Sequence, residues 1–298
     1  MTIKAIRGYE PNYIDPAQRI PRENGLYAKT KIEAFIRYCL AAERVFKGQK
    51  DRGKIRKIVH FEPFCGPGID ITKDGTQRFE GTPLRAVKEL KNYDIFIFND
   101  NDIDVMNCLF SELKDLRLHE NPDVEVILSV QDANESIGSL GEVLPKKVDS
   151  TYAFLGTAIV DPNGLHLRWD SAVLLAKRRL DLLEMVPTHI DLVRNLNNPS
   201  SPEDHIKLWL GNDPVSEDWV EVLTQYETKL KSIYKHVHGV STNPLPQAEY
   251  VWVERRYHLI SASNCSNDVA KNIWTGEVRR TVKATQGVPL PYGDDFLT

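Results

Sequence analysis

One short segment of the chain combines an acidic residue with a glycine-rich turn. The apolar run at residues 58–61 leads into Glu62, and Gly66 and Gly68 follow shortly after it. This pattern is typical of the first strand of a nucleotide-binding α/β sheet, because glycine lets the backbone approach a ligand closely. We therefore expect a cofactor site here. A glycine-rich turn that only joins a strand to a loop is the alternative.

The residues after the turn narrow the class of cofactor. A dinucleotide fingerprint needs a third glycine where this chain has Ile71, and a phosphate-binding loop needs a Gly-Lys-Ser/Thr run that does not follow. The remaining pattern resembles the first motif of class I methyltransferases, which bind S-adenosylmethionine. Its residues here are Glu62, Phe64, Gly66 and Gly68. That cofactor has an amino group and a carboxylate but no phosphate, so an acidic residue beside it is favourable.

A second apolar run, residues 93–98, ends beside Asp100. It is continuous and rich in β-forming residues, as the strands of buried parallel sheets are. A carboxylate at the tip of such a strand would accept hydrogen bonds from both ribose hydroxyls of an adenosine. Alternatively, Asp100 only ends the strand, and Asp102 caps the helix expected at 103–116. The two assignments are compatible with each other.

A third apolar run, residues 124–128, leads to Asp132 and Ala133. A polar side chain there would reach the adenine amino group of the cofactor, because the carboxyl ends of parallel strands meet at one edge of a sheet. Capping of the next helix by Asp132 or Asn134 explains these residues equally well.

The fourth run, residues 152–160, leads into Asp161, Pro162, Asn163 and Gly164. We expect these residues to face the same crevice and to contact the methyl acceptor. Enzymes that methylate exocyclic amino groups of bases have an Asp/Asn-Pro-Pro-aromatic run here, which accepts hydrogen bonds from the target nitrogen. The aromatic ring on which a flipped base would stack is missing in this chain. A turn in which Asp161 binds local amides is the alternative.

Several motifs occur in an order that is found in one family. They are Lys29-Thr30-Lys31-Ile32, the run from Glu62 to Gly68, Gly81-Thr82-Pro83-Leu84, Asp132-Ala133-Asn134 and Asp161-Pro162-Asn163-Gly164. In these motifs the chain resembles the three-Cys-motif partner (TcmP) proteins, over most of its length. The resemblance implies a methyltransferase encoded beside a radical-SAM protein, and it implies no particular substrate. Cys65 and Asn163 depart from the residues that are usual in that family.

We therefore predict an α/β protein with a Rossmann-like class I methyltransferase fold, in which an open, mostly parallel sheet has helices on both faces. Residues 1–28 should form an extended N-terminal arm rather than a helix or strand, because prolines are spaced through polar sequence. The methyltransferase-like domain is predicted at 29–275, with a helical insertion at about 187–240. Residues 276–298 would form a C-terminal tail.

The predicted function is methyl transfer from S-adenosylmethionine to a nucleic-acid base or nucleotide. Asp161, with the carbonyl of Pro162 and with Asn163, would orient the nucleophile, so catalysis would rest mainly on positioning. Two alternatives stay open. One is a non-catalytic partner that keeps this fold and docks on a radical-SAM enzyme, and the other is a small-molecule methyltransferase.

Charge gives mixed evidence on nucleic acid as a partner. The net charge of −4 provides no overall attraction to phosphates. Basic clusters at 50–57, 177–179, 229–235 and 255–256 would form one basic rim if they lie around the crevice. Taken singly, each cluster is more commonly a solvated surface.

The remaining composition bounds the location and the metal content. The four cysteines form no Cys-x-x-Cys pair, so neither a zinc ribbon nor an iron–sulfur cluster is indicated. Cys65 is either a reactive thiol or, more commonly, a packing residue. His236 and His238 lie on a predicted helix end and face different ways, so we predict no metal site. Without an apolar run of about 18 residues or a signal-peptide pattern, we expect a cytoplasmic protein with no membrane contact.

Overall fold

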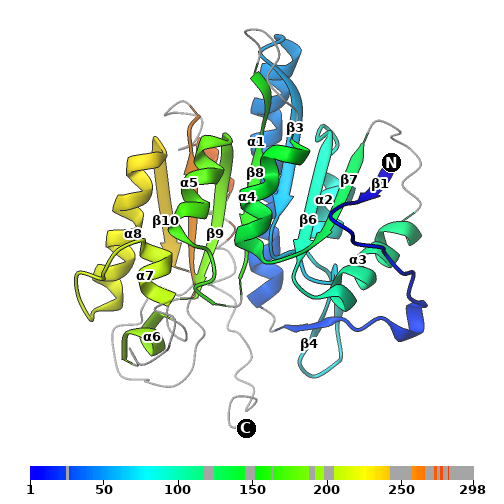
Figure 1. Cartoon of the computed structure of the whole chain (residues 1–298), viewed down its shortest axis with the longest axis horizontal. Helices are drawn as coiled ribbons and strands as arrows, with labels where there is room; N and C mark the ends of the chain where they lie inside the picture. Colours follow the sequence, from blue (N-terminus) through cyan, green and yellow to red (C-terminus); the bar gives the residue numbers. More distant parts are fainter. Residues whose placement is uncertain are drawn as a thin grey trace.

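Eight of the described strands form one twisted sheet in the order β1-β7-β6-β3-β8-β9-β11-β10 (Figure 1). The structure is a computed structural model that describes residues 1–24, 27–116, 124–144, 152–162, 164–187, 192–197, 205–241, 257–265, 272–273, 276–277 and 281. In sheet order the strands are β1 (Thr2–Ala5), β7 (Glu125–Val130), β6 (Ile95–Asp100), β3 (Ile55–Glu62), β8 (Tyr152–Val160), β9 (Leu180–Pro187), β11 (Tyr257–Ser263) and β10 (His236–Ser241). Of these eight strands, seven run in the same direction and β11 runs in the opposite one.

Helices cover both faces of the sheet because the strands are apolar on both sides. Successive residues of a strand point to opposite faces, and on β6 Phe96 packs with one core cluster while Ile97 packs with the other. On the Phe96 face lie α1 (Tyr27–Asp51), α2 (Thr82–Glu89) and α3 (Ile103–Asp115). On the Ile97 face lie α4 (Ala133–Val143), α5 (Trp169–Lys177), α7 (His205–Leu210) and α8 (Trp219–Ile233).

The order of the strands identifies the fold. β3 lies at the centre, β6 and β7 follow on one side, and β8 and β9 follow on the other. Ligands bind beyond the carboxyl ends of such strands where the order reverses, which is between β3 and β8. With the reversed β11 inserted between β9 and β10, the arrangement is that of a Rossmann-like class I methyltransferase. The predicted fold class is confirmed.

The N-terminal residues supply one strand to each of the two sheets that the structure describes. β1 extends the main sheet by pairing in parallel with β7. β2 (Arg22–Asn24) pairs with β4 (Ile69–Thr72), which pairs with β5 (Arg78–Glu80) to make a second, three-stranded sheet. Between β1 and β2 lies the short 3-10 helix η1 (Pro16–Gln18). We predicted no strand within residues 1–28, and this was wrong. The strands β1 and β2 form by pairing with β7 and β4, which lie much further along the chain, so the N-terminal sequence alone does not indicate them.

The segment predicted as a helical insertion contains α6 (Val193–Asn197), α7 and α8, and it ends in β10. His236 and His238 therefore lie on a strand, where residues two apart face the same side, and their predicted place on a helix end was wrong. Within the described residues, no three His, Cys, Asp or Glu side chains are grouped so that they could hold a metal ion. No described helix is both long and apolar enough to cross a bilayer.

A buried carboxyl group on β9 connects the sheet to the helices that cover it. Glu184 is 2% exposed and accepts hydrogen bonds from Trp209 Nε1 at 3.0 Å and from Tyr226 Oη at 2.6 Å. Burial raises the pKa of Glu184 to about 7, although both hydrogen bonds lower it. Glu184 therefore links β9 to α7 and α8, but the ionised form of its carboxyl group is unfavourable in the core.

This environment predicts a pH-dependent stability. Between the unfolded pKa of 4.5 and the folded value of about 7, only the folded state keeps the proton on Glu184, so stability falls as pH rises. In urea unfolding, the free energy of unfolding should fall by about 2 to 3 kcal/mol more in the wild type than in Glu184→Gln between pH 5 and pH 8. The exposed Glu217→Gln serves as the control and should follow the wild type. Equal slopes for all three proteins would contradict the prediction.

Candidate active site

The glycine-rich turn after β3 lies against the end of β6. Gly66 and Gly68 have φ angles of +69° and +85°, which L-residues with a side chain rarely adopt. The backbone N–H of Gly66 donates to Asp100 Oδ2 at 3.2 Å, and that of Cys65 donates to the carbonyl of Asn99 at 3.0 Å. The turn and the strand tip therefore form one unit at the carboxyl edge of the sheet.

Asp100 has a partly buried carboxylate at this unit. Its Oδ1 accepts the backbone N–H of Asp102 at 3.2 Å, and Asp102 in turn caps α3 by accepting from Asp104 N at 2.8 Å. Burial raises the pKa of Asp100, while the hydrogen bonds from Asp102 and Gly66 lower it. Asp100 thus contacts the glycine turn in addition to ending its strand, and Asp102 has the capping role that we predicted.

Asn99 is a positioning residue that the sequence did not indicate. It is fully buried, and its amide nitrogen donates to the carbonyl of Pro63 at 3.1 Å and to that of Gln131 at 3.0 Å. Its carbonyl oxygen accepts from Ser129 Oγ at 2.8 Å. One side chain on β6 therefore holds the residues that follow β3 and β7, and so fixes the relative position of the two loops.

The residues after β7 are held by capping. Asp132 is exposed and caps α4, because its Oδ1 accepts from Asn134 N at 2.9 Å and from Glu135 N at 3.2 Å. Ala133 beside it is buried. The side chain of Asn134 donates to the carbonyl of His166 at 3.0 Å and accepts from Arg168 N at 2.9 Å. Asn134 therefore holds the loop that follows β8, which is the predicted acceptor loop.

Glu62 points into the protein. It is 2% exposed, and its Oε1 lies 2.7 Å from His60 Nε2, whose Nδ1 lies 3.1 Å from Thr157 Oγ1. Burial raises the pKa of Glu62, and the hydrogen bond to His60 lowers it. This buried chain connects β3 to β8 and holds the carboxyl group in place at the base of the turn. Phe64 packs against the core cluster on the α4 face.

The predicted catalytic residue Asp161 forms a buried ion pair. Its Oδ2 lies 2.6 Å from Lys31 Nζ, and the two residues are 8% and 7% exposed. Pro162 is also buried, whereas Asn163 lies outside the described residues. The sequence did not reveal the role of Lys31, because it precedes Asp161 by 130 residues on another element.

Cys65 is a packing residue. It is 4% exposed, its Sγ lies 3.5 Å from Met106 Sδ, and burial raises its pKa well above the usual range. A thiol in this environment is a poor nucleophile. Of the two interpretations for Cys65, the structure favours packing.

Three of the basic clusters lie at the opposite, amino-terminal edge of the sheet. Residues 50–57 join α1 to β3, residues 177–179 join α5 to β9, and residues 229–235 lead from α8 into β10; α1 and β3 rise there above the other elements (Figure 1). Helix C-termini favour basic residues, and in α/β units these ends lie away from the crevice. The basic rim is therefore wrong for these clusters, and residues 255–256 lie outside the described residues.

Comparisons with known proteins give only distant structural similarities. Neither a protein-family model nor a curated protein matches the chain. Among solved structures, spermidine synthase from Thermotoga maritima has 14% sequence identity and a TM-score of 0.41, with 90% of this chain and 68% of that chain covered. The methyltransferase domain of bacterial CtHen1-C has 12% identity and a TM-score of 0.34, with 76% and 98% covered. Because both TM-scores are below 0.5, we assign the fold from the strand order and not from these similarities.

Proposed function

We propose that this chain is a class I methyltransferase that transfers a methyl group from S-adenosylmethionine to a nucleic-acid base or a nucleotide. The observation that carries the proposal is the hydrogen bond from Gly66 N to Asp100 Oδ2. It joins a carboxylate at the tip of β6 to the glycine turn after β3, at the carboxyl edge of the sheet and beside the place between β3 and β8 where the strand order reverses. A carboxylate in that position suits ribose hydroxyls.

The chemistry of the site fits this cofactor. Asp100 offers carboxylate oxygens to a ligand that has hydroxyls as hydrogen-bond donors, and Glu62 adds a buried carboxyl group at the base of the turn, on the side of an ammonium-bearing ligand. The same two carboxylates would repel a phosphate at the turn. The residues proposed to hold the cofactor are Glu62, Phe64, Gly66, Gly68, Asp100, Asp132 and Ala133. The sulfonium of S-adenosylmethionine supplies an electrophilic methyl group, so the protein mainly has to bind and orient the reactants.

Asp161 is proposed to orient the acceptor. Lys31 occupies its Oδ2, so Oδ1 would accept a hydrogen bond from the attacking nitrogen or oxygen. Lys31 also balances the charge of the buried carboxylate. The carbonyl of Pro162 and the side chain of Asn163 would complete the contacts to the acceptor.

The proposal extends to the family and the partner. We propose that the chain belongs to the TcmP family, with a radical-SAM three-Cys-motif protein as its partner, on the support of the ordered motifs. The four free cysteines, Cys39, Cys65, Cys108 and Cys265, support a cytoplasmic location because reducing compartments keep thiols free. A non-catalytic docking partner is the competing function, and it has no need of the Asp100 site.

Cofactor binding by the isolated chain tests the proposal. Calorimetric titration with S-adenosylhomocysteine should give micromolar affinity, and Asp100→Asn should weaken it by roughly 10-fold or more, since a charged hydrogen-bond partner of the ribose is lost. The matched control is Asp104→Asn, which removes an exposed carboxylate from the first turn of α3. It should change the affinity less than twofold. Absence of binding by the wild type would favour the docking partner.

A further inference from the structure

Arg22 lies directly against the glycine turn, although it comes from the N-terminal arm. It is the first residue of β2, and in the second sheet it pairs with Asp70 of β4. A Cβ atom placed on Gly66 would be 3.2 Å from Arg22 Nη1 and 3.4 Å from Arg22 Cζ. The guanidinium therefore occupies the space beside the Gly66 α-carbon, so an alanine at this position would be crowded as well as strained.

A buried carboxylate holds Arg22 in this position. Arg22 Nε donates to Asp70 Oδ1 at 2.8 Å, and Asn24 Nδ2 donates to the same oxygen at 2.8 Å. Asp70 is 1% exposed, so this ion pair is shielded from solvent on one side. Nε donates to Asp70, and Nη1 is the Arg22 nitrogen that lies nearest to the glycine turn.

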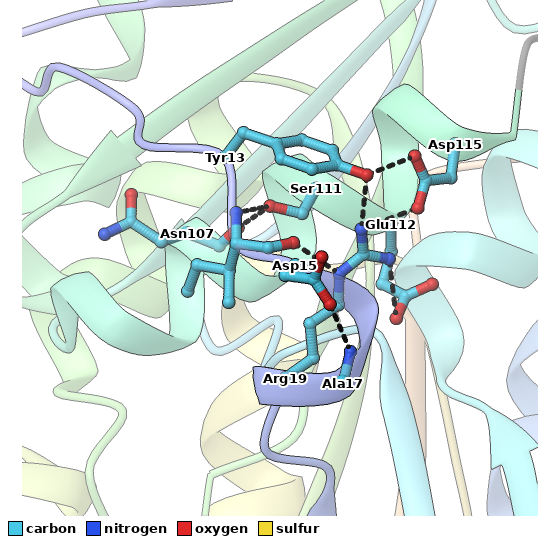
Figure 2. Close-up of polar contacts among 9 residues, drawn as sticks. Tyr13, Asp15, Ala17, Arg19, Asn107, Ser111, Glu112 and Asp115 are labelled. Atoms are coloured by element: carbon cyan, nitrogen blue, oxygen red, sulfur yellow. Dashed lines mark hydrogen bonds and ion pairs between the residues drawn. The ribbon is translucent and has the colours of Figure 1, made fainter.

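The arm that carries Arg22 is fastened to α3 (Figure 2). Arg19 Nη2 donates to Asp115 at 2.6 Å, its Nη1 lies 3.3 Å from Glu112, and its Nε donates to the carbonyl of Ile14 at 3.0 Å. The backbone N–H of Ile14 donates to Ser111 Oγ at 2.7 Å. Since α3 begins just after Asp100, one helix fixes both the arm and the strand tip.

We propose that Arg22 binds the carboxylate of the methionine part of S-adenosylmethionine. The inference rests on the proposed function and adds a residue to its site. Gly66 has Asp100 at its N–H and Arg22 beside its α-carbon, so an anion and a cation flank the turn. Asp100 suits the ribose hydroxyls, and the guanidinium of Arg22 suits the carboxylate, which is the only anionic group of this cofactor. Arginine forks match carboxylates in two parallel hydrogen bonds.

The test compares two cofactors that differ only in that carboxylate. Calorimetry would measure the Kd values of S-adenosylmethionine and of decarboxylated S-adenosylmethionine for the wild type and for Arg22→Gln. The wild type should bind S-adenosylmethionine about 10- to 100-fold more tightly than the decarboxylated form. In Arg22→Gln this preference should fall to less than about threefold, with little change in affinity for the decarboxylated form. Arg22→Lys, which keeps the charge but not the fork, should be intermediate.

The matched control is Arg78→Gln, an exposed arginine on β5 of the same small sheet, which should keep the wild-type preference. If Arg22→Gln weakens both cofactors by the same factor, Arg22 only supports the fold and the inference is overturned. Equal binding of both cofactors by the wild type would also overturn it while leaving the proposed function in place. Binding of neither by the wild type would overturn the proposed function itself.

Discussion

Replacing Lys31 with methionine should lower the free energy of unfolding by about 3 to 5 kcal/mol, because it leaves a buried carboxylate without its partner. The 2.6 Å pair with Asp161 joins α1 to the end of β8. Reversible urea unfolding at pH 7 would measure the loss. Lys47→Met is the matched control, since Lys47 also forms a 2.6 Å ion pair, with Asp51, but both side chains are about half exposed. That substitution should cost less than about 1 kcal/mol.

A double variant separates stability from catalysis at this pair. Lys31→Met with Asp161→Leu removes both charges, so most of the lost stability should return. Methyl transfer should remain at least about 100-fold below the wild type, because the group that orients the acceptor is gone. A double variant as active as the wild type would exclude Asp161 from the reaction. A Lys31→Met protein as stable as Lys47→Met would show that the pair is not desolvated.

Gly156→Ala should be among the most damaging single substitutions in the chain. Gly156 on β8 lies opposite Val59 of β3, and a Cβ atom there would be 2.0 Å from the Val59 carbonyl oxygen. No rotamer relieves a clash between Cβ and backbone, so the two central strands must separate. We expect a loss of at least about 4 kcal/mol in the free energy of unfolding, measured by chemical denaturation.

Gly138→Ala provides the comparison for that substitution. Gly138 lies in α4, and no atom lies within 4 Å of the position of an added Cβ. Alanine there should stabilise the protein by about 0.5 to 1 kcal/mol, because it restricts the unfolded chain and favours the helix. Similar stabilities for the two variants would mean that β3 and β8 are not paired as closely as described.

The central strands could be predicted because their sequence leaves few other choices. The apolar run at 152–160 became β8 with the same bounds, and the run at 93–98 contains most of β6. Long continuous apolar runs must be covered on both faces, which a parallel sheet between helices achieves. The polar residues that follow these parallel strands then lie at one edge of the sheet, which is why Asp100 and Asp161 could be predicted to lie there.

The short strands were missed because a distant partner determines them. Nothing within residues 2–5 requires a strand, and their hydrogen bonds are made to β7, which begins at Glu125. β10 follows α8 closely, so its two histidines were assigned to the helix end. A strand of this length gains its stability from pairing and not from its own sequence.

The same distance explains which site residues escaped prediction. Lys31 and Arg22 precede the glycine turn on elements of their own, and their partners lie 130 and 48 residues further along the chain. A cation's partner follows from three-dimensional packing, and a local pattern does not determine it. The basic clusters were misplaced for a related reason. They follow the carboxyl ends of helices, and the direction of these helices puts those ends at the edge of the sheet away from the crevice.

The pairing of β1 with β7 has a consequence for the order of events during protein synthesis. Residues 2–5 leave the ribosome more than a hundred residues before the strand that binds them. At the usual rates of elongation, this is a delay of roughly 5 to 25 s. Within that interval the arm gains its other partners one after another, first β4, which pairs with β2, and then α3, which binds Arg19. β1 can therefore join the sheet only after β7 has been made, although it precedes β6 and β3 in the chain.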